Sequence, residues 1–138
     1  MVKQINLLED MRVRLSVLWI FVMFNYLYCD ILGLFDPVVL KGLMTGSVDG
    51  LQLTQGFLLG ASILMEIPIA MVVFSLVLKY KVNRFANITA GAIMTVVQIS
   101  SLFVGTPAIY YVFFSIIEIA CTSLIVWYAW NWPNPEGK

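Results

Sequence analysis

Apolar residues fill four long stretches of the chain, and the polar residues are concentrated between these stretches. The stretches cover residues 15–34, 57–78, 85–104 and 108–130. A transmembrane helix needs about 20 mostly apolar residues, so each stretch is long enough to cross a bilayer. The pattern predicts an all-α, polytopic membrane protein: a single four-helix bundle over residues 1–138, with an outer loop at residues 35–56.

Parts of two predicted spans are apolar on every face, which argues against the alternative folds. Residues 15–24 contain one polar residue, Ser16, and residues 71–78 contain one, Ser75. A surface helix of a water-soluble domain needs a polar face. A transmembrane barrel needs sustained alternation of polar and apolar positions, and no stretch shows it. The expected surroundings of these helices are therefore lipid.

Composition supports the same class. The chain is 61% hydrophobic and 12% charged, whereas soluble domains are about 45–50% apolar and about 25% charged. Eight basic and eight acidic residues give no net charge, so we expect no nucleic-acid partner. With no His and two Cys, no histidine-ligated haem, usual zinc site or disulfide framework is expected, and we predict no cofactor.

Basic residues predict the orientation. Lys41 lies in the predicted outer loop, and the other seven of the eight basic residues lie on the opposite side: Lys3, Arg12, Arg14, Lys79, Lys81, Arg84 and Lys138. The positive-inside rule then places both termini in the cytoplasm. The first span is expected to be an uncleaved signal anchor, because acidic residues precede it and its apolar stretch is long.

The outer loop contains a helix start. Asp36 is a favourable N-cap residue and Pro37 suits the first helical turn. The apolar residues 38–44 that follow are expected to lie on the outer leaflet or to form a lid over an outward-facing cavity.

Several polar side chains lie within the predicted spans. An ionisable residue there costs about 2.5–3.5 kcal/mol on insertion scales, and no Lys or Arg lies in any span to pair with it. At about 100° per residue, the second, third and fourth spans each align their polar residues on one stripe, which we expect to face the bundle interior. The predicted ligand- or ion-binding residues are Glu66, Glu118, Asp30, Gln98, Asn25 and Tyr111.

Two functions follow from this site. The first is a small transporter or channel, expected to be a homodimer, that binds a proton, a cation or a cationic solute. The second is an accessory or assembly subunit of a larger membrane complex, in which protonated acids only hold the helices together. A membrane enzyme is a weaker alternative because the chain lacks His and any recognisable cofactor motif.

Residues 26–37 (YLYCDILGLFDP) and 65–71 (MEIPIAM) carry a resemblance over the full length of the chain. The chain resembles small bacterial four-helix membrane proteins of an uncharacterised family, filed as a domain of unknown function, and is loosely DoxX-like in size and topology. The resemblance implies a bacterial inner membrane and implies no particular chemistry. Small multidrug-resistance transporters also use a membrane-embedded Glu, but it lies in their first helix. The similarity is therefore one of physical principle and not of family.

Overall fold

The computed structural model describes residues 2–134, with side chains from Asp10 onward. Its elements are α1 (Val2–Gly33), α2 (Pro37–Thr45), β1 (Ser47–Val48), β2 (Leu51–Gln52), α3 (Gln55–Val77), α4 (Tyr80–Ser101) and α5 (Ile109–Trp130). The predicted all-α class is confirmed. The two-residue strands, which pair as an antiparallel hairpin, were not predicted.

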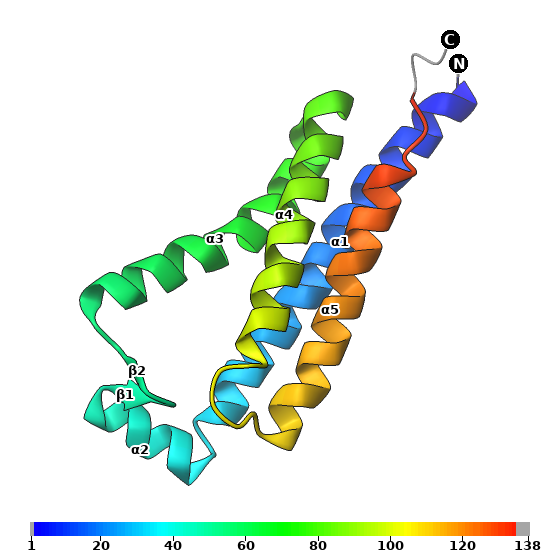
Figure 1. Cartoon of the computed structure of the whole chain (residues 1–138). Coiled ribbons are helices and arrows are strands. Elements are labelled where there is room, and N and C mark those ends of the chain that lie inside the picture. Colours follow the sequence, from blue (N-terminus) through cyan, green and yellow to red (C-terminus); the bar gives the residue numbers. More distant parts are fainter. Residues whose placement is uncertain (1, 135–138) are drawn as a thin grey trace.

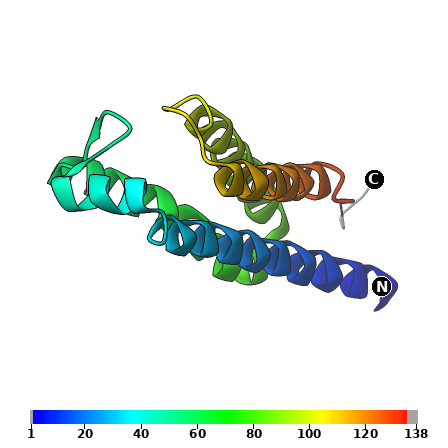
Figure 2. The ribbon, with the colours of Figure 1, turned by 90° about the horizontal axis from the view of Figure 1, so that it is seen from below.

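The long helices run between two distinct ends of the molecule (Figure 1). The start of α1, the α3–α4 turn and the end of α5 lie together at one end, here called the terminal end. The α4–α5 loop lies at the other end, together with α2 and the β1–β2 hairpin, which we call the cap. Helix α1 packs against α3 and α5, and α4 packs along α5. The view from below shows α4 alongside α5 (Figure 2).

Helix boundaries agree with the predicted spans except at two places. Helix α1 begins at Val2, so the first predicted span is part of one continuous helix. Helix α4 begins at Tyr80 and ends at Ser101, earlier at both ends than the predicted 85–104. Helix α4 starts before the predicted span because Asn83, a polar residue of its first turns, is buried inside the protein, which hydropathy does not reveal.

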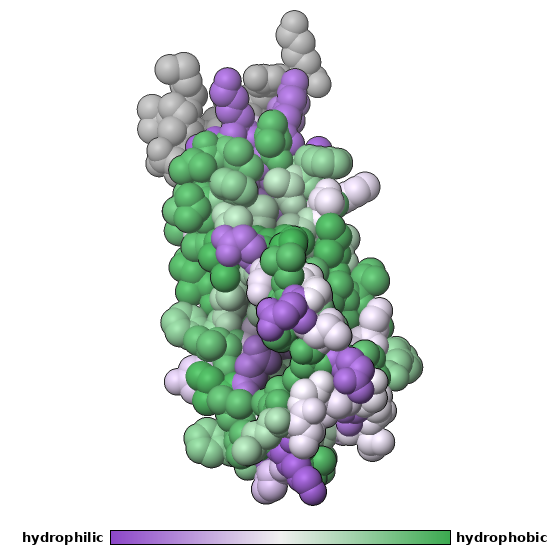
Figure 3. Space-filling view, turned by 90° about the vertical axis from the view of Figure 1, so that its left-hand side faces the viewer, coloured by the Kyte–Doolittle hydropathy of each residue, from purple (hydrophilic) through white to green (hydrophobic). Residues whose placement is uncertain are grey.

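Among the described residues, three helices are long and apolar enough to cross a membrane: Asp10–Gly33, Gln55–Val77 and Ile109–Trp130. Helix α4 is more polar, and its three amide side chains, those of Asn83, Asn87 and Gln98, face inward. Its buried residues are Asn83, Asn87, Ala90, Gly91, Met94 and Gln98, whereas its exposed large residues are Val82, Phe85, Ile93, Val96 and Ile99. A helix on a water-soluble surface has the opposite arrangement. The mainly apolar surface in Figure 3 agrees, and this pattern indicates a membrane protein.

Helix α3 bends at mid-length, and only its second half packs closely in the bundle (Figure 1). Pro68 lies inside the helix and accounts for the bend, because proline lacks a backbone N–H and clashes with the preceding turn. Residues 54–63 are all exposed. The prediction that Gln55, Ser62 and Glu66 face the bundle interior is therefore wrong for the single chain, since all three are exposed.

A buried hydrogen-bonded network joins three helices toward the terminal end. Asn87 Oδ1 accepts from Trp19 Nε1 at 2.7 Å and from Ser75 Oγ at 3.2 Å. Asn87 Nδ2 donates to Asn83 Oδ1 at 2.7 Å, and Asn83 Nδ2 donates to the Ser75 carbonyl at 2.7 Å. All four side chains are fully buried. The network ties α1, α3 and α4 together without any charged group.

A second set of bonds fastens α4 to the last turn of α5. Arg84 donates from Nε to the Ala129 carbonyl at 3.0 Å and from Nη2 to the Trp130 carbonyl at 2.8 Å. Tyr80 donates its hydroxyl to the Trp132 carbonyl at 2.8 Å. A cation at a helix C-terminus satisfies carbonyls that have no partner within the helix. The terminal half of the bundle is therefore closed by hydrogen bonds.

Candidate functional site

A small acidic cavity lies between α1, α3, α4 and α5. This inner chamber has a volume of about 110 Å³. Its polar lining residues are Tyr26, Asp30, Gln98, Tyr111 and Glu118. The remaining walls are mostly apolar side chains of α3 and α4. Polar groups from three helices therefore converge on one small space.

Glu118 is the most unusual residue of the chamber. Its side chain is 1% exposed, and neither carboxylate oxygen has a hydrogen-bond partner. The buried hydroxyl of Tyr26, which lines the same chamber, also has no partner. Buried polar atoms are nearly always paired, and an unpaired buried carboxyl is especially costly. The chamber therefore offers unsatisfied acceptors to a bound donor or cation.

The other polar residues of the chamber are held in place by their neighbours. Gln98 Nε2 donates to Ser115 Oγ at 2.8 Å, and Ser115 donates to the Tyr111 carbonyl at 2.8 Å. The Tyr111 hydroxyl donates to Ser101 Oγ at 2.7 Å. These bonds fix the Gln98 amide and the Tyr111 ring between α4 and α5, so the chamber wall is preorganised.

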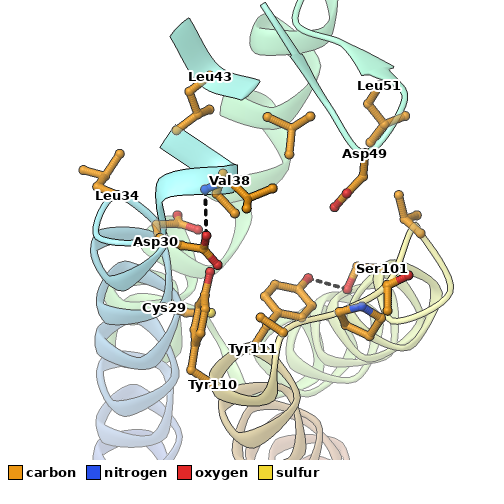
Figure 4. A pocket seen from close by; sticks show the side chains of 18 of the residues that line it. Cys29, Asp30, Leu34, Val38, Leu43, Asp49, Leu51, Ser101, Tyr110 and Tyr111 are labelled. Atoms are coloured by element: carbon orange, nitrogen blue, oxygen red, sulfur yellow. Dashed lines mark hydrogen bonds between the residues drawn. The ribbon is translucent and has the colours of Figure 1, made fainter. Parts of the chain in front are cut away.

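A larger cavity opens beneath the cap. This vestibule has a volume of about 570 Å³ and is lined by the end of α1, the cap and the α4–α5 loop (Figure 4). Three carboxylates line it, those of Asp30, Asp36 and Asp49. Asp30 and Tyr111 line both cavities, as does Cys29. The vestibule and the inner chamber therefore meet at these residues, and no Lys or Arg lines either cavity.

The cap is built by local sequence features. Asp36 caps α2, with Oδ1 accepting from Val38 N at 2.9 Å and Pro37 in the first turn, which confirms the predicted helix start. At the hairpin turn, Asp49 has a φ of 48°. Its carboxyl carbon lies 2.7 Å from where a Cβ on Gly105 would stand. The cap thus touches the α4–α5 loop at the vestibule rim.

Comparison with known proteins gives a family and no activity. The model of a family of unknown function, DUF6326, matches residues 2–137. The chain belongs to this family. No curated protein and no solved structure matches it. DUF6326 membership agrees with the expected resemblance to an uncharacterised family, while bacterial origin and the likeness to DoxX proteins stay predictions.

Four of the six predicted site residues of this DUF6326 chain line the inner chamber: Asp30, Gln98, Tyr111 and Glu118. The other two lie elsewhere. Glu66 is exposed on α3, and Asn25 Nδ2 donates to the Phe21 carbonyl of its own helix at 2.8 Å; neither residue lines either cavity. Whether the four residues bind a ligand stays a prediction.

Tyr26 is the chamber residue that the predicted site omits. It precedes Asp30 by four residues on α1 and therefore lies on the same helix face. That spacing was the available signal, but a tyrosine in a membrane helix is usually read as an interfacial anchor. Its burial and its unpaired hydroxyl distinguish it from such an anchor.

Proposed function

We propose that this protein is a small transporter or channel that binds a proton or a cation in the inner chamber. The observation that carries the proposal is Glu118, a fully buried carboxyl with two unpaired oxygens in a cavity that contains no basic side chain. An amide would serve equally well to hold helices together. A carboxyl can in addition bind a positive charge. Its insertion into a membrane is costly, and holding the helices together does not require that cost.

The proposed topology has four transmembrane helices, including α4, in a bacterial inner membrane, with both termini in the cytoplasm. In support of this topology, the terminal end carries five basic residues, Arg12, Arg14, Lys79, Lys81 and Arg84, and the cap carries Lys41. The positive-inside rule then assigns the terminal end to the cytoplasm. The vestibule faces outward in this orientation, and the hydrogen-bonded network separates the chamber from the cytoplasm.

A Glu→Gln exchange at position 118 tests the proposed site. Full-length protein in lipid nanodiscs is studied by carboxyl infrared difference spectroscopy, after pH steps and after addition of Na⁺ or K⁺. We expect a carboxyl band that responds to pH or to a cation in the wild type and disappears in Glu118→Gln. Proteoliposome flux of the same ions is expected to disappear with the band.

Glu66→Gln is the matched control, because Glu66 lies on the exposed face of α3 away from both cavities. We expect it to leave the Glu118 band unchanged. A wild-type band that ignores pH and both cations, or one that persists in Glu118→Gln, would refute the proposal.

The exposed Glu66 favours a second candidate function, a subunit that assembles with another chain. A carboxyl facing lipid is costly, and its neighbour Ser62 satisfies itself on its own helix, donating to the Leu58 carbonyl at 2.8 Å. Another chain packed on this face would cover Glu66. Native mass spectrometry after gentle extraction separates the cases: a homodimer fits a transporter, whereas a stoichiometric foreign protein fits an accessory subunit.

A further inference from the structure

We infer that the chamber and the vestibule together form the binding site for an organic ammonium ion: the charged head lies between Glu118 and Asp30, and the apolar body lies in the vestibule. This inference rests on the proposed function of the inner chamber and specifies its ligand. It goes beyond a site for a proton or an inorganic ion, which would use the chamber alone.

The sizes of the two cavities fit two parts of one ligand. The inner chamber, at about 110 Å³, accommodates a charged group with a few waters. The vestibule, at about 570 Å³, lies within the range of about 300–1,000 Å³ that is typical of small-molecule sites. Because Asp30 and Tyr111 line both cavities, a ligand in the vestibule lies against the residues that bound the chamber, and in the inferred binding mode its head lies past them.

The lining chemistry divides in the same way. The vestibule walls are largely apolar, with Leu34, Val38, Val39, Leu43 and Val104 among their residues. Of its three carboxylates, Asp36 is already engaged as the α2 cap, and Asp49 lies at the rim against Gly105. Asp30 is the carboxylate shared with the chamber, so Asp30 and Glu118 together place two acidic groups where the two cavities adjoin.

Glu118 independently indicates where a positive head would bind. It is buried and unpartnered, and it lines the chamber that Asp30 joins to the vestibule. Tyr111 lines both cavities and Tyr110 lines the vestibule (Figure 4). Aromatic rings attract cations through their faces, and the Tyr111–Ser101 bond holds one of these rings in place. An ammonium group both hydrogen-bonds the carboxylates and balances their charge, whereas a neutral head leaves that charge unbalanced and an anionic head is repelled.

The experiment measures equilibrium binding of a homologous series to full-length protein in zwitterionic nanodiscs. The probes are methylammonium, n-butylammonium and n-hexylammonium, with n-hexanol as the neutral control. Burial of each methylene in the vestibule is expected to raise the affinity about fourfold. Glu118→Gln should abolish binding of all three ammonium ions and leave n-hexanol partitioning unchanged.

A second variant probes the vestibule alone. Ala108 lines the vestibule but not the chamber, and its extended backbone, with φ −67° and ψ 154°, suits a leucine. We expect Ala108→Leu to remove most of the gain from chain length and to keep methylammonium binding.

The outcomes distinguish this inference from the proposed function. If methylammonium or a proton acts at Glu118 but affinity does not rise with chain length, the organic ligand is refuted and the proposed function stands. Equal n-hexylammonium binding to the wild type and to Glu118→Gln shows partitioning into lipid and also refutes the inference. If no ammonium ion binds and the Glu118 band does not respond to pH or inorganic cations, both the inference and the proposed function are refuted.

Discussion

Replacing Asn87 by leucine tests whether the buried network holds the bundle together. Asn87 accepts from Trp19 and Ser75 and donates to Asn83. Leucine has a similar volume but no hydrogen-bonding atom. The substitution therefore leaves the Trp19 indole N–H and the Asn83 side-chain oxygen without partners, while the Ser75 hydroxyl can turn to a carbonyl of its own helix.

The expected loss follows from the two orphaned groups. An unpaired buried polar group costs about 1–3 kcal/mol, whereas side-chain hydrogen bonds between membrane helices average about 0.6 kcal/mol. Trp19, Asn83 and Asn87 are each 0% exposed, and two of their bonds are only 2.7 Å long. We therefore expect Asn87→Leu to lower the free energy of unfolding by about 2–4 kcal/mol.

Asn25→Leu is the matched control. The Asn25 amide is half-buried and donates to a carbonyl of its own helix, so its loss should change stability by less than about 0.5 kcal/mol. Unfolding is followed by far-ultraviolet circular dichroism as the fraction of sodium dodecyl sulfate in mixed micelles is increased. A Trp19→Phe, Asn87→Leu double-mutant cycle should show a coupling of about 1 kcal/mol or more. Equal destabilisation by the two Asn→Leu variants would refute the role of the network.

Two glycine pairs give further predictions. An added Cβ at Gly91 lies 2.7 Å from an α5 side-chain atom, whereas at Gly60 it meets nothing within 4 Å. In the same unfolding assay, Gly91→Ala should therefore lower the free energy of unfolding by about 1–3 kcal/mol. Gly60→Ala should leave it unchanged. Gly105 and Gly50 both have positive φ, but an added Cβ meets Asp49 of the hairpin turn at Gly105, whereas at Gly50, inside that turn, it meets nothing within 4 Å. Gly105→Ala should therefore open the cap and raise maleimide labelling of the Cys29 peptide several-fold over Gly50→Ala; equal labelling would contradict the contact.

Hydrophobic periodicity predicted the helices and two of the three polar stripes. The stripes of α4 and α5 are buried at Asn87, Gln98 and Glu118, because polar groups in an apolar helix must face other protein groups. Asn83 was missed because it precedes the predicted span, where a polar residue ordinarily indicates a loop. Trp19 was missed because an indole in an apolar helix gives no sign of its partner.

The candidate site was less predictable, since it depends on how the helices are arranged. The spacing within each helix places Glu118 and Gln98 on interior faces, but the path of α3 decides the position of Glu66. Pro68 bends α3, and the direction of a proline bend is determined by the neighbouring helices rather than by local sequence. The vestibule likewise depends on the contact between Asp49 and Gly105, two loop residues far apart in the chain.

The inward polarity of α4 has a consequence for biogenesis. The asparagines and the glutamine that make this helix poorly suited to lipid by composition find their partners on α1, α3 and α5. A nascent α4 is therefore expected to partition weakly into the bilayer by itself. The connection to α5 spans only residues 102–108, so the two helices are expected to leave the translocon as a hairpin whose apolar partner carries the polar one. In the proposed topology, completion of the membrane insertion of α4 would then wait for α5 to be synthesised.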